Sequence, residues 1–156
     1  MRQIKFRAWD KQRRHMFDVE QLAYNLRGEL VSIYGFGRDF SNDQEALMGE
    51  EPDLDKAVLM QFTGLHDKNG RDIYEGDLLR VELDDDPDSY YIAPVTWCGA
   101  DYPAFDIMSK YWPKNVSYDT NVLSAIVAGW SEEVMSVVGN IYENPELMEV
   151  AEHDET

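Results

Sequence analysis

Four acidic residues, Asp84, Asp85, Asp86 and Asp88, form the densest cluster of reactive side chains in the chain. They surround Pro87, and the stretch has the composition of a hairpin loop. Carboxylate oxygens can hold a hard cation, but a calcium or magnesium site needs ligands at defined positions. Crowded like charges are also typical of a solvated hairpin end, so we assign no metal here and treat the cluster as a candidate partner-binding surface.

A second stretch rich in oxygen ligands runs from Asp67 to Asp77. An EF-hand calcium loop needs Gly at its sixth position and a bidentate Glu at its twelfth. Counted from Asp67, Gly70 is fourth and Leu78 is twelfth. The spacing excludes a calcium loop, whereas Asn69-Gly70 predicts a tight β-turn because both residue types accept a positive φ.

Cys98 is the only cysteine, so it can form neither an intramolecular disulfide nor a two-cysteine metal site. A nucleophilic thiol would need a base, for which His66 is the candidate, and an aspartate to orient that base. The surrounding sequence TWCGAD supplies no helix N-terminus and no cation to activate the thiol. The histidines lack metal-binding spacing. We predict no catalytic, metal or cofactor-binding residue, and an enzyme using Cys98, His66 and aspartates is kept as an alternative.

The charge of the chain is high and unevenly placed. Its 156 residues carry a net −17, yet residues 1–14 hold six basic residues against Asp10, so the rest carries −22. An acidic body repels nucleic acids and anionic membranes over about 8 Å at physiological salt and attracts basic partners. With 44% hydrophobic residues the chain is still expected to fold. We predict a protein partner of basic character, with nucleic acid and membranes disfavoured.

The expected cellular compartment follows from the absence of a recognisable secretory signal and of a transmembrane stretch in this sequence. The basic N-terminal residues are not followed by the apolar run of a secretory signal, and no stretch approaches transmembrane length. A lone cysteine suits a reducing compartment. We expect a cytoplasmic protein.

The hydrophobic pattern predicts a mainly β fold. Apolar and polar residues alternate over residues 4–9, 57–62, 79–83 and 90–97, which is the period of half-buried strands. The last of these would place Tyr91, Ala93, Val95 and Trp97 on one face. We predict a meander or small SH3-like barrel-type core, preceded by an N-terminal β-hairpin whose tip is residues 10–14.

Helices are expected to be few and short. Residues 41–48 could form one, capped by Ser41 with Gln44, within an otherwise irregular tract between strands. Thr120–Gly129 is open between a buried strand and a helix capped near Asp119, and we favour the helix. After a strand at residues 134–138, Asn144-Pro145 predicts a terminal helix over 145–151. Residues 1–150 should form one domain with one core, followed by a frayed acidic tail over 151–156.

Three sequence blocks resemble the YopX family, small proteins of unassigned activity encoded mainly by phages and prophages of Gram-positive bacteria. The blocks are IKFRAWDKQRRHM at 4–16, LMQFTGLHDKNGRDIYEGD at 59–77 and VVGNIYENPELM at 137–148. The resemblance implies a phage-derived, mainly β intracellular protein. It implies no catalytic residues.

These observations favour a non-enzymatic interaction protein that acts on a host or phage component. One concrete form is an acidic decoy that occupies the basic groove of a nucleic-acid-binding protein. Self-association through β edges and the basic hairpin would make it a homo-oligomer. The alternatives are the thiol enzyme above and a small barrel that binds nucleic acid through Trp97, Trp112 and the basic hairpin.

Overall fold

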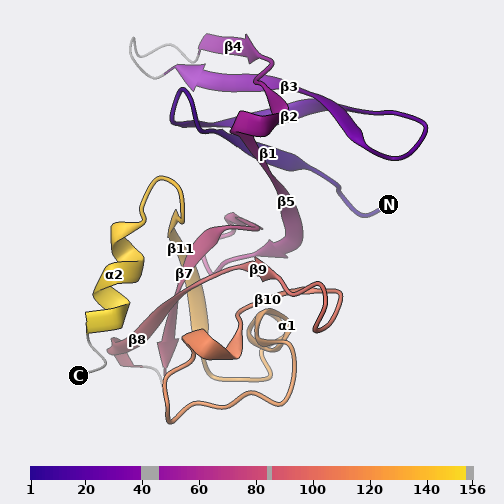
Figure 1. Cartoon of the computed structure of the whole chain (residues 1–156). Helices are drawn as coiled ribbons and strands as arrows, with labels where there is room; N and C mark the ends of the chain where they lie inside the picture. Colours follow the sequence, from indigo (N-terminus) through magenta and orange to yellow (C-terminus); the bar gives the residue numbers. More distant parts are fainter. Residues whose placement is uncertain (40–45, 84–85, 154–156) are drawn as a thin grey trace. The chain divides into compact units, whose positions relative to one another are not determined.

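The computed structural model describes residues 1–39, 46–83 and 86–153, and the chain divides into two compact units, Met1–Gln61 and Phe62–Thr156 (Figure 1). Where one core was expected, the described buried apolar residues form two clusters, one in each unit. The single domain over residues 1–150 stays a prediction.

The first unit is an antiparallel sheet with the strand order β4-β3-β2-β1-β5. Its elements are β1 (Phe6–Asp10), β2 (His15–Tyr24), β3 (Leu30–Asp39), β4 (Ala46–Glu50), the 3-10 turn η1 (Leu54–Lys56) and the first half of β5 (Ala57–His66), whose second half belongs to the second unit. The predicted N-terminal hairpin is confirmed, because β1 and β2 pair from Arg7 opposite Asp18 to Asp10 opposite His15. The Asp10 carboxylate accepts the amides of Gln12 (2.9 Å) and Arg13 (3.0 Å), which shapes the tip.

Strand β4 corrects the prediction for the glycine-rich tract. Residues 46–48, assigned above to a helix, pair with β3 in the register Gly37 opposite Met48, and Ser41 and Gln44 lie outside the described residues. The glycine-rich tract belongs to β3, and Gly35 lies where an added Cβ would overlap the carbonyl oxygen of Asp18 in β2. Glycine at this position therefore allows two strands to approach closely and does not mark an irregular loop.

The second unit contains a three-stranded sheet in the order β11-β7-β8, with two small strand pairings and two helices beside it. Its elements are β6 (Asp72–Tyr74), β7 (Asp77–Leu83), β8 (Asp86–Pro94), β9 (Thr96–Trp97), β10 (Phe105–Asp106), the 3-10 turn η2 (Ser109–Tyr111), α1 (Val122–Val127), β11 (Val134–Asn140) and α2 (Glu146–His153). Strand β6 pairs with the second half of β5, β9 pairs with β10, and α2 contacts β8 (Figure 1).

The apolar core of the second unit joins this sheet to α1. The buried residues of the cluster are Ile73, Leu79, Val81, Tyr91, Ala93, Val95, Ile107, Val122, Leu123, Ile126, Met135 and Val137. Three of them come from α1 and two from β11, and buried Val95 and Val122 lie at the two ends of the tract that contains β9 and β10.

The mainly β fold class is confirmed, including the short C-terminal helix. The sheets formed by the described strands are open, so no SH3-like barrel closes among them. Trp97 departs from its predicted face: Tyr91, Ala93 and Val95 are buried, but Trp97 is 48% exposed. Trp97 lies on β9, opposite Phe105 of β10, and its ring packs edge-on against that phenyl ring at 4.9 Å.

The open choice at Thr120–Gly129 is settled as helix α1. Its N-cap is Asn121, two residues after Asp119, and the Asn121 side chain accepts the amide of Ser124 at 2.9 Å. Helix α2 reaches His153, and the rest of the predicted tail lies outside the described residues. The side chain of Asn144, expected to cap α2, accepts the amide of Asn140 (3.2 Å) instead.

None of the helices within the described part of the chain is long and apolar enough to cross a membrane.

Candidate functional site

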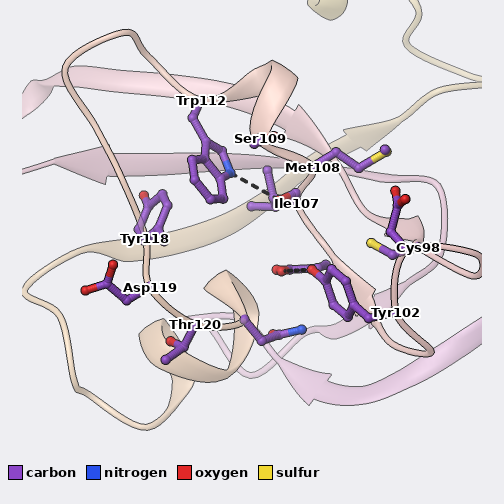
Figure 2. A pocket seen from close by; sticks show the side chains of 12 residues that line it. Cys98, Tyr102, Ile107, Met108, Ser109, Trp112, Tyr118, Asp119 and Thr120 are labelled. Carbon is purple, nitrogen blue, oxygen red and sulfur yellow. Dashed lines mark hydrogen bonds between the residues drawn. The ribbon is translucent and has the colours of Figure 1, made fainter.

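A pocket of about 460 Å³ lies in the second unit, between the β9–β10 hairpin, the η2 segment and the start of α1 (Figure 2). The twelve residues that line it are Cys98, Asp101, Tyr102, Asp106, Ile107, Met108, Ser109, Trp112, Tyr118, Asp119, Thr120 and Asn121. The volume falls within the range of about 300–1,000 Å³ that small-molecule binding sites occupy. We treat this cavity as the candidate site.

One side of the pocket is built by the hairpin between β9 and β10. The amide of Cys98 donates to the carbonyl of Ala104 (2.9 Å), and Gly99 takes a positive φ of 49°, which allows the tight reversal. The reversal places the Tyr102 ring at the pocket, where its hydroxyl donates to the Asp106 carboxylate. Figure 2 shows this ring beside Cys98.

Asp106 joins this hairpin to helix α1. Its other carboxylate oxygen accepts the amides of Val122 (2.8 Å) and Leu123 (3.3 Å), so both oxygens have donors, and the residue is 2% exposed. A buried carboxylate is tolerated when it is fully hydrogen-bonded. Asp106 therefore supports the pocket floor and adds negative charge there, with both of its oxygens already hydrogen-bonded within the protein.

The other side of the pocket is aromatic. The indole of Trp112 donates to the carbonyl of Ile107 (3.1 Å), and its ring stands nearly perpendicular to that of Tyr118, with centroids 4.8 Å apart. The Tyr118 hydroxyl is in turn 2.7 Å from the hydroxyl of Tyr91. Figure 2 shows Trp112 and Tyr118 together, across the cavity from Tyr102. Each ring is held by its own polar group, so the wall is largely preformed.

The tyrosine hydroxyls of the pocket remain neutral. Burial raises the pKa of Tyr102 well above its usual range, and its contacts with Asp106 and Cys98 raise it further. Burial and the Tyr91 hydroxyl likewise raise the pKa of Tyr118, with a further contribution from Glu133. Ionisation of either phenol is therefore disfavoured at neutral pH. These groups can donate and accept hydrogen bonds but are poorly suited to act as bases.

The charge of the lining is negative. Asp101 and Asp119 are exposed at the pocket, Asp106 lies beneath it, and none of the twelve lining residues is Lys or Arg. Chemically, aromatic faces combined with carboxylates suit a cation. No group of three His, Cys, Asp or Glu residues placed to hold a metal ion is found where the structure describes the chain.

A model of the family described as YopX protein matches residues 5–149 of this chain. The chain belongs to the YopX family. Among solved structures, it is similar to the crystal structure of protein EF1440 from Enterococcus faecalis, with 25% identity over 95% of this chain and 99% of that one and a TM-score of 0.62. It also shares the fold of protein YopX from Bacillus subtilis, with 21% identity over 94% and 98% of the two chains and a TM-score of 0.52. No curated protein matches it.

In this YopX protein the two residues of the alternative thiol mechanism are not brought together. Cys98 is buried at the candidate site, and its thiol lies 3.7 Å from the carbonyl of Thr96. His66 lines a different pocket, of about 170 Å³, and its Nε2 lies 3.1 Å from the Asp72 carboxylate. The geometry gives Cys98 no histidine partner among the residues that line its pocket.

The predicted partner-binding aspartates lie elsewhere. Asp86 and Asp88 are exposed at the start of β8, where the Asp86 carboxylate accepts the amide of Asp88 (2.9 Å), and neither lines either pocket. Asp84 and Asp85 lie outside the described residues. The predicted loop is shorter than expected, because Asp86 already pairs with Leu83.

The second family block, at residues 59–77, stabilises the fold. Asp67 is 7% exposed and accepts the amides of Asn69 (2.8 Å) and Arg71 (2.9 Å), closing the turn, and that of Val137 (2.9 Å) in β11. Arg71 adds a bond from its guanidinium to the carbonyl of Val137 (3.2 Å). The turn at 67–71 thus covers the outer edge of β11, and this blunts an otherwise unpaired strand edge.

The second and third family blocks therefore meet in space. Asn140 pairs with Asp77, and the amide of Ile141 donates to the carbonyl of Gly76 (3.0 Å). The pocket residues all fall between 98 and 121, outside the three blocks. The sequence singled out only Cys98 and Trp112, in two separate hypotheses, and missed the other ten as site residues because no motif marks this tract. A usable signal was present in Asp101-Tyr102 and Tyr118-Asp119, since acidic and aromatic residues in a long connection are typical of binding loops.

Proposed function

We propose that this YopX protein is a non-enzymatic interaction protein that binds a basic protein partner through its second unit. The observation that carries the proposal is the distribution of charge. Residues 62–156 contain twenty acidic and five basic residues, a net −15, whereas residues 1–61 contain eleven and nine, a net −2. A field of one sign over one unit steers a partner of the opposite sign and raises the rate of encounter.

The candidate site supports binding over catalysis. Its hydroxyls are held neutral, Asp106 is fully hydrogen-bonded, and Cys98 and His66 line different pockets. What remains accessible is a preformed cavity with aromatic rings and exposed carboxylates. These are the side chains that recognise a cation, and they need no chemical step.

The finer form of the proposal is an acidic decoy. On this view the protein is encoded by a phage or prophage, acts in the cytoplasm of the bacterial host, and competes with nucleic acid for the basic surface of a host or phage protein. Membership of the YopX family motivates the phage origin, and the net charge of the second unit motivates the competition. Direct binding of nucleic acid is disfavoured by the same charge.

The test is a pull-down with the full chain as bait from nuclease-treated host lysate, at about 50 mM and about 500 mM salt, because screening shortens the range of electrostatic attraction. The matched control bait is an unrelated folded protein of similar size and net charge. We expect basic proteins that are retained by the YopX chain at low salt, released at high salt and not retained by the control. Identical retention by both baits, or none by either, contradicts the proposed function.

A further inference from the structure

We propose that the candidate pocket is the binding site for an arginine side chain of the basic partner. The inference rests on the proposed function and names the group that the site would recognise. Three features of the pocket support it: the aromatic wall, the accessible carboxylates and a lining without Lys or Arg.

The aromatic wall provides the first part of the site. Trp112 and Tyr118 stand at 76° to one another, and Tyr102 lies across the cavity from them (Figure 2). A guanidinium group is planar and weakly hydrated, so it stacks on such rings better than an ammonium does. Because the rings are already fixed by hydrogen bonds to Ile107, Tyr91 and Asp106, little side-chain entropy is lost when a ligand enters.

The accessible carboxylates provide the second part. Asp101 and Asp119 are exposed, and neither forms an ion pair with any residue of the described ranges 1–39, 46–83 and 86–153. They come from opposite ends of the lining segment, on the hairpin and just before α1. A guanidinium has five donors in a planar fork and can bond to more than one acceptor at once.

The surrounding charges agree with a cationic ligand. The basic residues nearest in sequence, Lys110 and Lys114, do not line the pocket, and the ammonium of Lys110 lies 5.0 Å from the centroid of the Tyr111 ring. Asp106 adds negative potential from beneath, although its oxygens are occupied. An anionic ligand would meet three carboxylates with no lining cation to offset them, and an apolar ligand would leave those carboxylates desolvated.

The experiment titrates blocked tetra-arginine, tetralysine and tetracitrulline peptides into the full, nitrogen-labelled chain and follows its four tryptophan indole signals. Trp112→Phe identifies the signal of that residue. We expect the Trp112 signal to move most, arginine to bind about 3-fold or more tighter than lysine, as stacking of the guanidinium implies, and neutral citrulline to leave the signal in place.

A pair of double variants distinguishes binding at the pocket from attraction to the overall negative charge. Asp101→Asn with Asp119→Asn removes two carboxylates at the pocket, and Asp86→Asn with Asp88→Asn removes two exposed carboxylates outside it. We expect about a 10-fold loss of tetra-arginine affinity in the first and less than about 2-fold in the second, because a close charge contact outweighs a distant screened one. Unchanged Trp9, Trp97 and Trp130 signals show that the variants remain folded.

The outcomes distinguish this inference from the proposed function. The pocket is not the arginine site if the two double variants lose affinity equally, or if the peptide binds and leaves the Trp112 signal in place. Either result still allows a basic partner that binds the second unit. Tighter binding of lysine than arginine overturns the guanidinium assignment. Failure of the lysate experiment together with no peptide binding overturns both.

Discussion

The two units of this YopX protein differ in how they combine core and charge. In the first, the buried cluster consists of Ala8, Phe17 and Ile33, and the sequence carries a net −2. In the second, twelve buried residues form the cluster, and the sequence carries a net −15. Concentrated like charge destabilises a compact state, and apolar burial offsets it. The unit with the larger described core is thus the one able to present a strongly acidic surface.

The two units also differ in the turns within the first and second family blocks. Asp10 and Asp67 are both buried and both accept backbone amides of their own turn. The Asp67 carboxylate also accepts the amide of Val137, seventy residues further along the chain. The Asp10 carboxylate thus shapes the tip of its own hairpin, whereas the Asp67 carboxylate also ties its turn to a distant strand.

The largest expected effect comes from Gly35→Ala in the first unit. The new methyl group would meet the backbone of β2 at Asp18 and the ring of Phe17, and backbone cannot move aside as a side-chain end can. Overpacking of this kind costs about 3 kcal/mol, a large fraction of the stability of a small unit. We expect the indole signal of Trp9 to lose its native position while those of Trp97, Trp112 and Trp130 keep theirs.

The control for this variant is Gly28→Ala. Gly28 has a φ of 78° but no atom within 4 Å of an added Cβ, so the change costs only backbone strain of about 1–2 kcal/mol. Simultaneous loss of all four indole signals in Gly35→Ala would contradict separate stability of the two units.

The next effect in size is expected from Asp67→Ala, compared with Asp10→Ala. Removing the Asp67 carboxylate leaves three backbone amides without their acceptor, at a cost of about 3 kcal/mol, against about 1–2 kcal/mol for the two amides at Asp10. Urea unfolding followed separately at Trp9 and at the three tryptophans of the second unit measures both. Equal losses would show that the bond to Val137 adds nothing to the turn.

Local signals account for most of what the sequence predicted correctly. Asn69-Gly70 specified a turn, and Gly70 has a φ of 79°. The tip at residues 11–14 and the helices near 122–127 and 146–153 likewise depend on residues within a few positions of one another. Each of these elements is decided by neighbours in the sequence, so each could be predicted from short windows.

Errors arose where distant pairing decides the structure. β4 exists through its ladder with β3, and Trp97 leaves the face of Tyr91 because it pairs with Phe105 of β10 rather than with β7. The candidate site has the same origin. It forms because Asp106 bonds to the amide of Val122 and Asn121 bonds to the carbonyl of Phe105. No pattern among neighbouring residues of the sequence predicts such bonds.

A moderate effect is expected from pH, again confined to the second unit. Burial alone would raise the pKa of Asp67, but the amides of Val137, Arg71 and Asn69 and the charge of Arg71 outweigh it and hold that pKa below its usual value. A lowered folded pKa adds stability above the unfolded value, and that stability is lost as the pH falls through the folded value.

We therefore expect the difference in unfolding free energy between the native chain and Asp67→Asn to shrink as the pH falls from about 5 to about 2, across the range in which aspartates protonate. Urea titrations at several pH values, followed at the tryptophans of the second unit, measure this difference. A difference that stays constant with pH would mean that the charge on Asp67 is not what these amides stabilise.

The smallest expected effect is weak self-association, in which the basic hairpin of one copy meets the acidic unit of another. Lys11 and Arg14 are exposed at the hairpin tip. Exposed ion pairs contribute about 0.2–1 kcal/mol each and are screened by salt, so the average solution mass should rise with concentration only at low ionic strength. Lys11→Gln with Arg14→Gln should lower that mass. The matched variant Lys110→Gln with Lys114→Gln removes the same charge from the acidic unit and should leave the mass unchanged or raise it. If sedimentation gave the mass of one chain at every salt concentration, the charge difference between the two units would not drive self-association. It would then act only on other proteins.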